Sequence, residues 1–164
     1  NKLLQRSGNG WVLGPGIAKA AGHARNEGAL ALLILLDADD FCVKEASESI
    51  GPLLAEATGF AVSKIVFAVR EYEAWLLASA ESLVDGGAVF SGDPEVPRDA
   101  KGTLSEHLRL PYPYSKTTDQ PAFSTKMDLA LTYRRSRSFQ KLTREVKNLL
   151  EICGLTPAEW PVNP

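Results

Sequence analysis

The feature that most constrains the fold is a run of eight apolar residues, at positions 29–36, that ends directly in a carboxylate. Gly28 precedes the run and Asp37 follows it. The run is too short and too uniformly apolar for an amphipathic surface helix, and far below the ~20 residues that a membrane helix needs. We therefore predict a β-strand over residues 29–36, buried on both faces as in parallel sheets, and no membrane partner.

Helical and extended patterns alternate around this strand. The sequence predicts helices over residues 17–26, 44–58 and 71–84, and a second strand over residues 64–69. The middle helix is expected to break at Gly51 and Pro52. Before Gly14 we predict no apolar strand. Helix and strand in alternation favour an α/β fold in which neighbouring parallel strands gather functional residues at their carboxyl ends.

The second half has a different character. Residues 85–118 are rich in Gly and Pro, which predicts loops, with a short helix over residues 103–108. Asp119 is typical of the N-cap of a helix that reaches about residue 133, and Ser138 of the N-cap of a last helix that ends at Gly154. We predict an α/β core over residues 1–90, and a loop-rich segment with two carboxyl-terminal helices packed on it over residues 91–164.

Charge is unevenly distributed along the chain. Residues 27–99 contain 14 acidic and 4 basic side chains, whereas residues 101–147 contain 10 basic and 4 acidic ones. A site for a hard cation in the first half and a phosphate-binding surface in the second would explain this split, and so would two solvated faces. The two cysteines lie far apart without a CxxC pattern, which favours a reducing, cytoplasmic setting.

Three carboxylates follow the first strand, at Asp37, Asp39 and Asp40. Side chains two residues apart on an extended segment point the same way, so Asp37 and Asp39 can converge on one point. Oxygen ligands on a short turn suit Mg²⁺ or Mn²⁺. An Asx turn that caps the next helix is the alternative, but one Asp would satisfy it. We favour a metal site.

Glu71 and Glu73 follow the second predicted strand in the same way. If the two strands are neighbours, one of these side chains opens onto the rim that carries Asp37 and Asp39. Taken alone, the two acids are better explained as partners of the helix dipole, with Trp75 as a core residue.

Three segments together resemble a known family. They read LLDADDFC, VFAVREYEAWLLASAESL and YSKTTDQPAFSTKMDLALTYRRSRSFQKL. They are similar to an uncharacterised bacterial family of the Toprim-like superfamily, related to the overcoming-lysogenization-defect nucleases. The resemblance implies a Toprim-like Rossmannoid parallel sheet flanked by helices, with a helical carboxyl-terminal extension. Asp37 and Asp39 match the Asp-x-Asp motif that binds Mg²⁺ in Toprim domains, and Glu73 is the best match to a third acid.

The resemblance implies Mg²⁺-dependent hydrolysis of phosphodiester bonds in nucleic acid, in defence against phages or mobile elements. The catalytic residues would be Asp37, Asp39 and Glu73, with Asp40 as a further metal ligand. The family pattern also includes a first strand that ends in Glu-Gly, which is not found before Gly14, so we expect the chain to be a piece of a longer protein. The alternative is a non-catalytic binding or regulatory module that partners an ATPase.

Basic residues near the end of the chain are candidates for nucleic-acid binding. They are Arg134, Arg135, Arg137 and Lys141, followed by Arg144 and Lys147. Exposed bases on helices more often serve solubility and local pairing, which is the alternative here. Lys101, Lys116 and Thr117 are weaker candidates for a phosphate contact.

Overall fold

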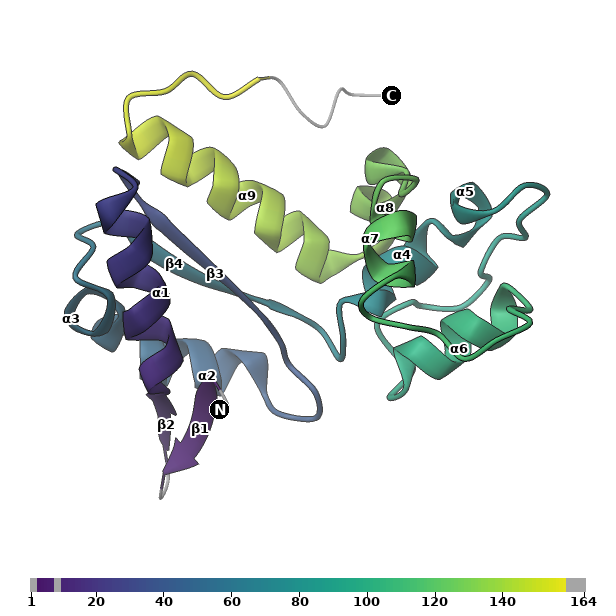
Figure 1. Ribbon diagram of the computed structural model, residues 1–164, viewed down its shortest axis with the longest axis horizontal. Coiled ribbons are helices and arrows are strands. Elements are labelled where there is room, and N and C mark those ends of the chain that lie inside the picture. Colours follow the sequence, from purple (N-terminus) through teal and green to yellow (C-terminus); the bar gives the residue numbers. More distant parts are fainter. Residues whose placement is uncertain (1–2, 8–9, 159–164) are drawn as a thin grey trace. The chain divides into compact units, whose positions relative to one another are not determined.

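The computed structural model describes residues 3–7 and 10–158. Figure 1 shows the arrangement of helices and strands along the chain. The strands are β1 (Leu4–Ser7), β2 (Gly10–Leu13), β3 (Leu32–Asp37) and β4 (Ser63–Ala68). The helices are α1 (Pro15–Asn26), α2 (Val43–Ile50), η1 (Gly51–Leu53), α3 (Leu54–Thr58), α4 (Glu73–Ala78), α5 (Ala80–Leu83), α6 (Ala100–His107), α7 (Asp119–Ser124), α8 (Leu129–Arg135) and α9 (Arg137–Ile152). None of the helices in the described ranges has the length and apolar character needed to cross a membrane.

The two predicted strands form one parallel sheet, as expected. Strands β3 and β4 are hydrogen-bonded neighbours, and helices flank them. Near the start of the strands Leu32 N donates to Val62 O at 3.0 Å, and near their ends Ala38 N donates to Ala68 O at 2.9 Å. The α/β class is therefore confirmed in this coarse form, with two strands in the described part of the sheet.

The start of the chain contains two short strands, where the sequence predicted no apolar strand before Gly14. Strands β1 and β2 pair antiparallel, with Leu4 opposite Leu13 and Ser7 opposite Gly10. In the sequence they are separated by Gly and Asn, the residues that hairpin turns favour. Each segment is too short to be recognised as a strand alone, and only their pairing makes them strands.

Two predicted helices are each divided. The helix expected over residues 71–84 begins at Glu73, after Arg70 adopts a left-handed φ of 64°, and it is interrupted at Ser79, where φ is −127°. The helix expected from Asp119 to about residue 133 becomes α7 and α8, because the Asp128 carboxylate accepts a hydrogen bond from Leu131 N and starts a new helix. The expected break at Gly51 and Pro52 is confirmed by η1 between α2 and α3.

The chain forms two compact units that do not divide near residue 90. Of the described residues, the first contains residues 3–7, 10–36, 41–66 and 143–158, and the second contains residues 37–40 and 67–142. The beginnings of β3 and β4 thus belong to the first unit, and their carboxyl ends belong to the second. The sequence of the second half could not show that the end of α9 returns to the first unit.

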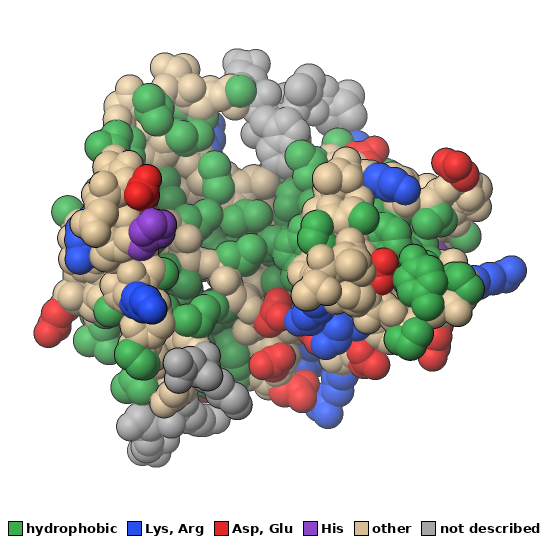
Figure 2. All heavy atoms as spheres, viewed as in Figure 1, with side chains coloured by type: hydrophobic (Ala, Val, Ile, Leu, Met, Phe, Trp, Pro, Cys, Tyr) green, Lys and Arg blue, Asp and Glu red, His purple; other side chains and the backbone are tan. Residues whose placement is uncertain are grey.

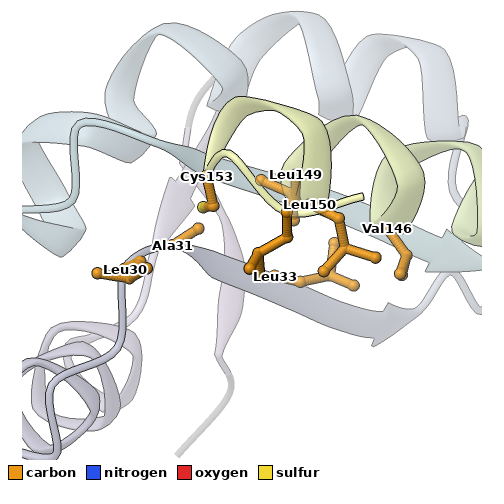
Figure 3. A pocket seen from close by; sticks show the side chains of 8 residues that line it. Leu30, Ala31, Leu33, Val146, Leu149, Leu150 and Cys153 are labelled. Atoms are coloured by element: carbon orange, nitrogen blue, oxygen red, sulfur yellow. The ribbon is translucent and has the colours of Figure 1, made fainter. Parts of the chain in front are cut away.

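The first unit leaves part of β3 uncovered, which corrects the prediction of a strand buried on both faces. Ile34 is buried, whereas Leu35 is 39% exposed and Leu30, just before the strand, is 70% exposed. Figure 3 shows an apolar groove of about 380 Å³ between this region and the end of α9. Its lining residues are Leu30, Ala31, Leu33, Val146, Leu149, Leu150, Cys153 and Leu155. Side chains alternate between the two faces of a strand, so Leu33 and Leu35 lie on the face opposite Ile34, and the described residues cover that face only partly.

Helix α4 is the centre of the second unit, and all six of its residues are buried. The Trp75 side chain is 1% exposed and packs against Ala68 and Phe139. Its indole N–H donates to Ser138 Oγ at 2.8 Å, which satisfies the one polar atom of the ring. Trp75 is therefore a core residue, and the buried α4 fixes the position of its first residue, Glu73.

Glu95 caps the start of α9 from a distant loop. Its Oε1 accepts hydrogen bonds from the Ser138 backbone N–H at 2.8 Å, the Ser138 hydroxyl at 2.6 Å and the Ser136 hydroxyl at 2.7 Å. Replacing Glu95 by Ala is expected to lower the free energy of unfolding by about 2–3 kcal/mol, because a charged acceptor at a helix N-terminus is lost. Urea denaturation measures this change. The exposed Glu106→Ala in α6 is the control, and equal effects of both substitutions would contradict the capping role.

Candidate functional site

The candidate site lies in the second unit, where β3 and β4 end. Backbone pairing continues past the strands, since Asp39 N donates to Arg70 O at 2.8 Å. The loops that follow the two strands therefore run side by side, and the acids of both loops share one rim. Figure 2 shows acidic and basic side chains intermingled in the lower middle of the view, where Figure 1 draws the ends of β3 and β4 and the start of α6.

Asp37 is the last residue of β3 and faces the second loop. Its Oδ1 accepts a hydrogen bond from the Tyr72 backbone N–H at 2.8 Å. Its Oδ2 lies 3.6 Å from Lys116 Nζ. The side chain is 34% exposed, so solvent or a ligand can still reach it.

Asp39 and Asp40 differ from Asp37 in their contacts. Asp40 is paired with two guanidinium groups, at 2.5 Å from Arg70 Nη1 and 3.4 Å from Arg98 Nε. Asp39 adopts a left-handed φ of 48°, which Asp and Asn tolerate better than most residues. The Asp39 side chain is exposed, and within the described part of the chain its carboxylate has no hydrogen bond or ion pair.

Glu71 and Glu73 differ in their burial and in their interaction partners. Glu71 is held by Lys101, whose Nζ lies 2.5 Å from Oε1 and whose backbone N–H donates to Oε2 at 3.2 Å. Glu73 is fully buried, at 0% exposure, and neither of its oxygens has a hydrogen-bond partner in the described residues. Of the two glutamates, only Glu71 forms an ion pair in the described residues, and the preference for Glu73 over Glu71 as a ligand stays a prediction.

The surroundings of Glu73 raise the pKa of its carboxyl group. Burial raises the pKa of the Glu73 carboxyl, and the charge of Glu71 adds to this rise. Hydrogen bonding from its own backbone, the positive charge of Lys116 and the Tyr114 hydroxyl oppose it. Burial also raises the pKa of Tyr114, and the charge of Glu73 and its interaction with the hydroxyl raise it further. The Glu73 carboxylate and the Tyr114 hydroxyl are thus buried neighbours that act on each other, and neither makes a hydrogen bond of normal length in the described residues.

Lys116 lies beside Asp37, and its charge also acts on Glu73, but the predicted ligands do not form one cluster in the described residues. Within the described ranges, no group of three or more Asp, Glu, His or Cys side chains is placed to hold a metal ion. The oxygen donors of Asp37 and Glu73 suit Mg²⁺ or Mn²⁺, and the unsatisfied oxygens of Glu73 fit a bound cation. Asp40 is already neutralised by Arg70 and Arg98.

The predicted basic patch divides into two kinds of residue. Arg135 binds Glu81, with distances of 2.8 and 3.0 Å from Nη1 to the two carboxylate oxygens, and it also donates to Ala78 O. That contact ties α8 to α4 and α5. Arg134, Arg137 and Lys141 have exposed side chains.

Sequence reasoning missed three of the residues around the acids. Arg70 and Arg98 were not expected to pair with Asp40, and Tyr114 was not expected beside Glu73. The one sequence feature that linked Tyr114 to this site was its position two residues before Lys116. Pairing across such separations depends on tertiary contacts.

Comparisons of the chain with protein-family models, with curated proteins and with solved structures gave no match. The resemblance to the Toprim-like family stays a prediction, carried by the quoted segments.

Proposed function

We propose that the protein hydrolyses phosphodiester bonds in nucleic acid with the help of Mg²⁺ or Mn²⁺. The observation that carries this proposal is the buried Glu73 carboxylate, which makes no hydrogen bond of normal length in the described residues. The charge of Lys116, which lies beside Asp37, also acts on it. A buried carboxylate without a donor is strongly unfavourable in a folded protein, and a cation that binds it removes this penalty. A role in defence against phages or mobile elements follows from the resemblance alone.

In this proposal Asp37 and Glu73 hold the metal ion, and Asp39 completes its surroundings from the exposed side of the turn. The bound metal would supply Lewis-acid stabilisation of the phosphate and would lower the pKa of the attacking water. Arg134, Arg137 and Lys141 are proposed to contact the nucleic-acid backbone, because exposed bases contribute the salt-dependent part of such binding.

A non-catalytic module that binds a partner, with an ATPase as the proposed partner, is the second candidate. The observation that favours it is the neutralisation of the acids by neighbouring bases. Asp40 pairs with Arg70 and Arg98, and Glu71 pairs with Lys101. A rim whose charges are largely satisfied can serve as a docking surface without any chemistry.

The two candidates differ in metal binding and in cleavage. We expect the wild-type chain to bind Mn²⁺, followed by electron paramagnetic resonance, and to cleave DNA or RNA at low salt in a reaction that EDTA stops. Single-stranded and double-stranded forms of both nucleic acids should be compared. Nucleic-acid binding without cleavage would favour the binding module. Absence of both metal binding and cleavage would overturn the proposed hydrolysis.

A further inference from the structure

Lys116 lies next to the proposed metal ligands, where a positive charge balances the carboxylates. Its Nζ lies 3.6 Å from Asp37 Oδ2, and its charge acts on the buried Glu73 carboxyl. The Glu73 carboxylate makes no hydrogen bond of normal length within the described residues. Its own backbone, the charge of Lys116 and the Tyr114 hydroxyl all lower its pKa, in that order. In the absence of a metal, Lys116 is therefore the counter-ion of Asp37, and its charge also acts on Glu73.

The segment that carries Lys116 is anchored, whereas its ammonium group is not tightly held. The Asp119 carboxylate accepts a hydrogen bond from the Ser115 backbone N–H at 2.7 Å, which fixes the turn before α7. The Lys116 side chain is 47% exposed, and its contact with Asp37 is longer than a hydrogen bond. A long, partly solvated contact of this kind is weak and easily exchanged.

Lys101, on the same rim, is a tightly held lysine. Its ammonium group lies 2.5 Å from Glu71, and its backbone N–H binds the other oxygen of the same carboxylate. The side chain is also less exposed, at 34%. The contrast indicates that Lys101 is part of the framework and that Lys116 is free to change partner.

From these contacts we propose that a divalent cation displaces Lys116 from Asp37, and that the released ammonium group binds the phosphate of the substrate. This inference rests on the proposed function and deepens it. An ammonium group and a divalent cation repel each other at one carboxylate, so metal binding moves the lysine outward. A phosphodiester attracts both the metal and the lysine. Metal and phosphate therefore bind cooperatively, each raising the affinity for the other.

The proposal predicts effects of opposite sign for one substitution. Lys116→Met removes the competing cation, so we expect Mn²⁺ to bind about fivefold more tightly, the upper range for a partly exposed ion pair. The same substitution removes a phosphate contact, so the affinity for a short fluorescein-labelled single-stranded DNA in the presence of Mn²⁺ should fall about fivefold or more. If Lys116 had only a structural role, its substitution would weaken both Mn²⁺ binding and DNA binding.

Mn²⁺ binding is measured by electron paramagnetic resonance and DNA binding by fluorescence anisotropy, with and without Mn²⁺. Lys126→Met is the matched control, because Lys126 is an exposed lysine of the same unit for which no ion pair to a described residue is found. Lys116→Arg keeps the charge and should restore most of the DNA affinity. Thermal melts followed by circular dichroism show whether each variant folds.

The outcomes separate this inference from the proposed function. If the wild type binds Mn²⁺ but Lys116→Met binds it equally or less tightly, displacement is wrong and the proposed hydrolysis stands. If Lys116→Met binds Mn²⁺ more tightly but holds DNA as the wild type does, the phosphate role is wrong. If the wild type binds no Mn²⁺, both the inference and the proposed function fail.

Discussion

Replacing Glu73 by Gln is expected to abolish hydrolysis and, at the same time, to make the protein more stable at neutral pH. The carboxylate is fully buried, and its oxygens lack hydrogen-bond partners in the described residues. Gln has nearly the same shape and carries no charge, so the desolvation penalty of the ionised group disappears. We expect a gain of about 1–3 kcal/mol in the free energy of unfolding, measured by urea denaturation.

The gain should depend on pH in a defined direction. Burial raises the pKa of Glu73 above its ordinary value of 4.5, and Glu71 adds to the rise, whereas its own backbone, Lys116 and the Tyr114 hydroxyl oppose it. A raised carboxyl pKa means that the folded state prefers the protonated form. Its contribution to stability is present below about pH 4.5 and is lost as the pH rises through the folded pKa. The difference between wild type and Glu73→Gln should therefore be small in acid and grow toward neutral pH.

Loss of activity in Glu73→Gln should reach about a hundredfold or more, because a bound metal contributes several kcal/mol to the transition state. Glu71→Gln is the matched control. It removes the partner of Lys101, so it should lose stability rather than gain it. If Glu73→Gln is active and less stable than the wild type, Glu73 is a structural residue and the proposed site is wrong.

Changing Asp37 and Asp39 together to Asn should remove hydrolysis by a factor of about a thousand while leaving the fold intact. The amide oxygen of Asn at position 37 can still accept the hydrogen bond from Tyr72 N–H. Asn also tolerates the left-handed φ of 48° at position 39. Stability should consequently change by less than about 1 kcal/mol, since the contact with Lys116 is partly exposed.

The double variant should be tested beside Asp40→Asn, whose carboxylate is bound by Arg70 and Arg98. Cleavage of the preferred nucleic acid and Mn²⁺ binding are measured for both, and circular dichroism reports on folding. We expect the single variant to keep most of the Mn²⁺ affinity. Cleavage at the wild-type rate in the double variant would mean that a contaminant or another active site is responsible.

Local patterns in the sequence were enough to predict the elements that build the rim. The apolar runs of β3 and β4, the helices between them and the carboxylates behind each strand all follow from short-range signals, as does the break at Gly51 and Pro52. Those signals act over a few residues, through side-chain periodicity and the backbone limits of Gly and Pro. For the same reason, the hairpin at the start was not predicted, because each of its strands is only four residues long.

The sequence by itself determined that acids follow two neighbouring parallel strands. Only the tertiary structure decided which of them are paired with bases and which is buried without an ion pair in the described residues. Arg70 and Arg98 take Asp40, Lys101 takes Glu71, and the burial of α4 leaves Glu73 without a hydrogen-bond partner in the described residues. These partners come from loops and helices far along the chain. Ion pairing and burial depend on distances in space, and no local pattern encodes those distances.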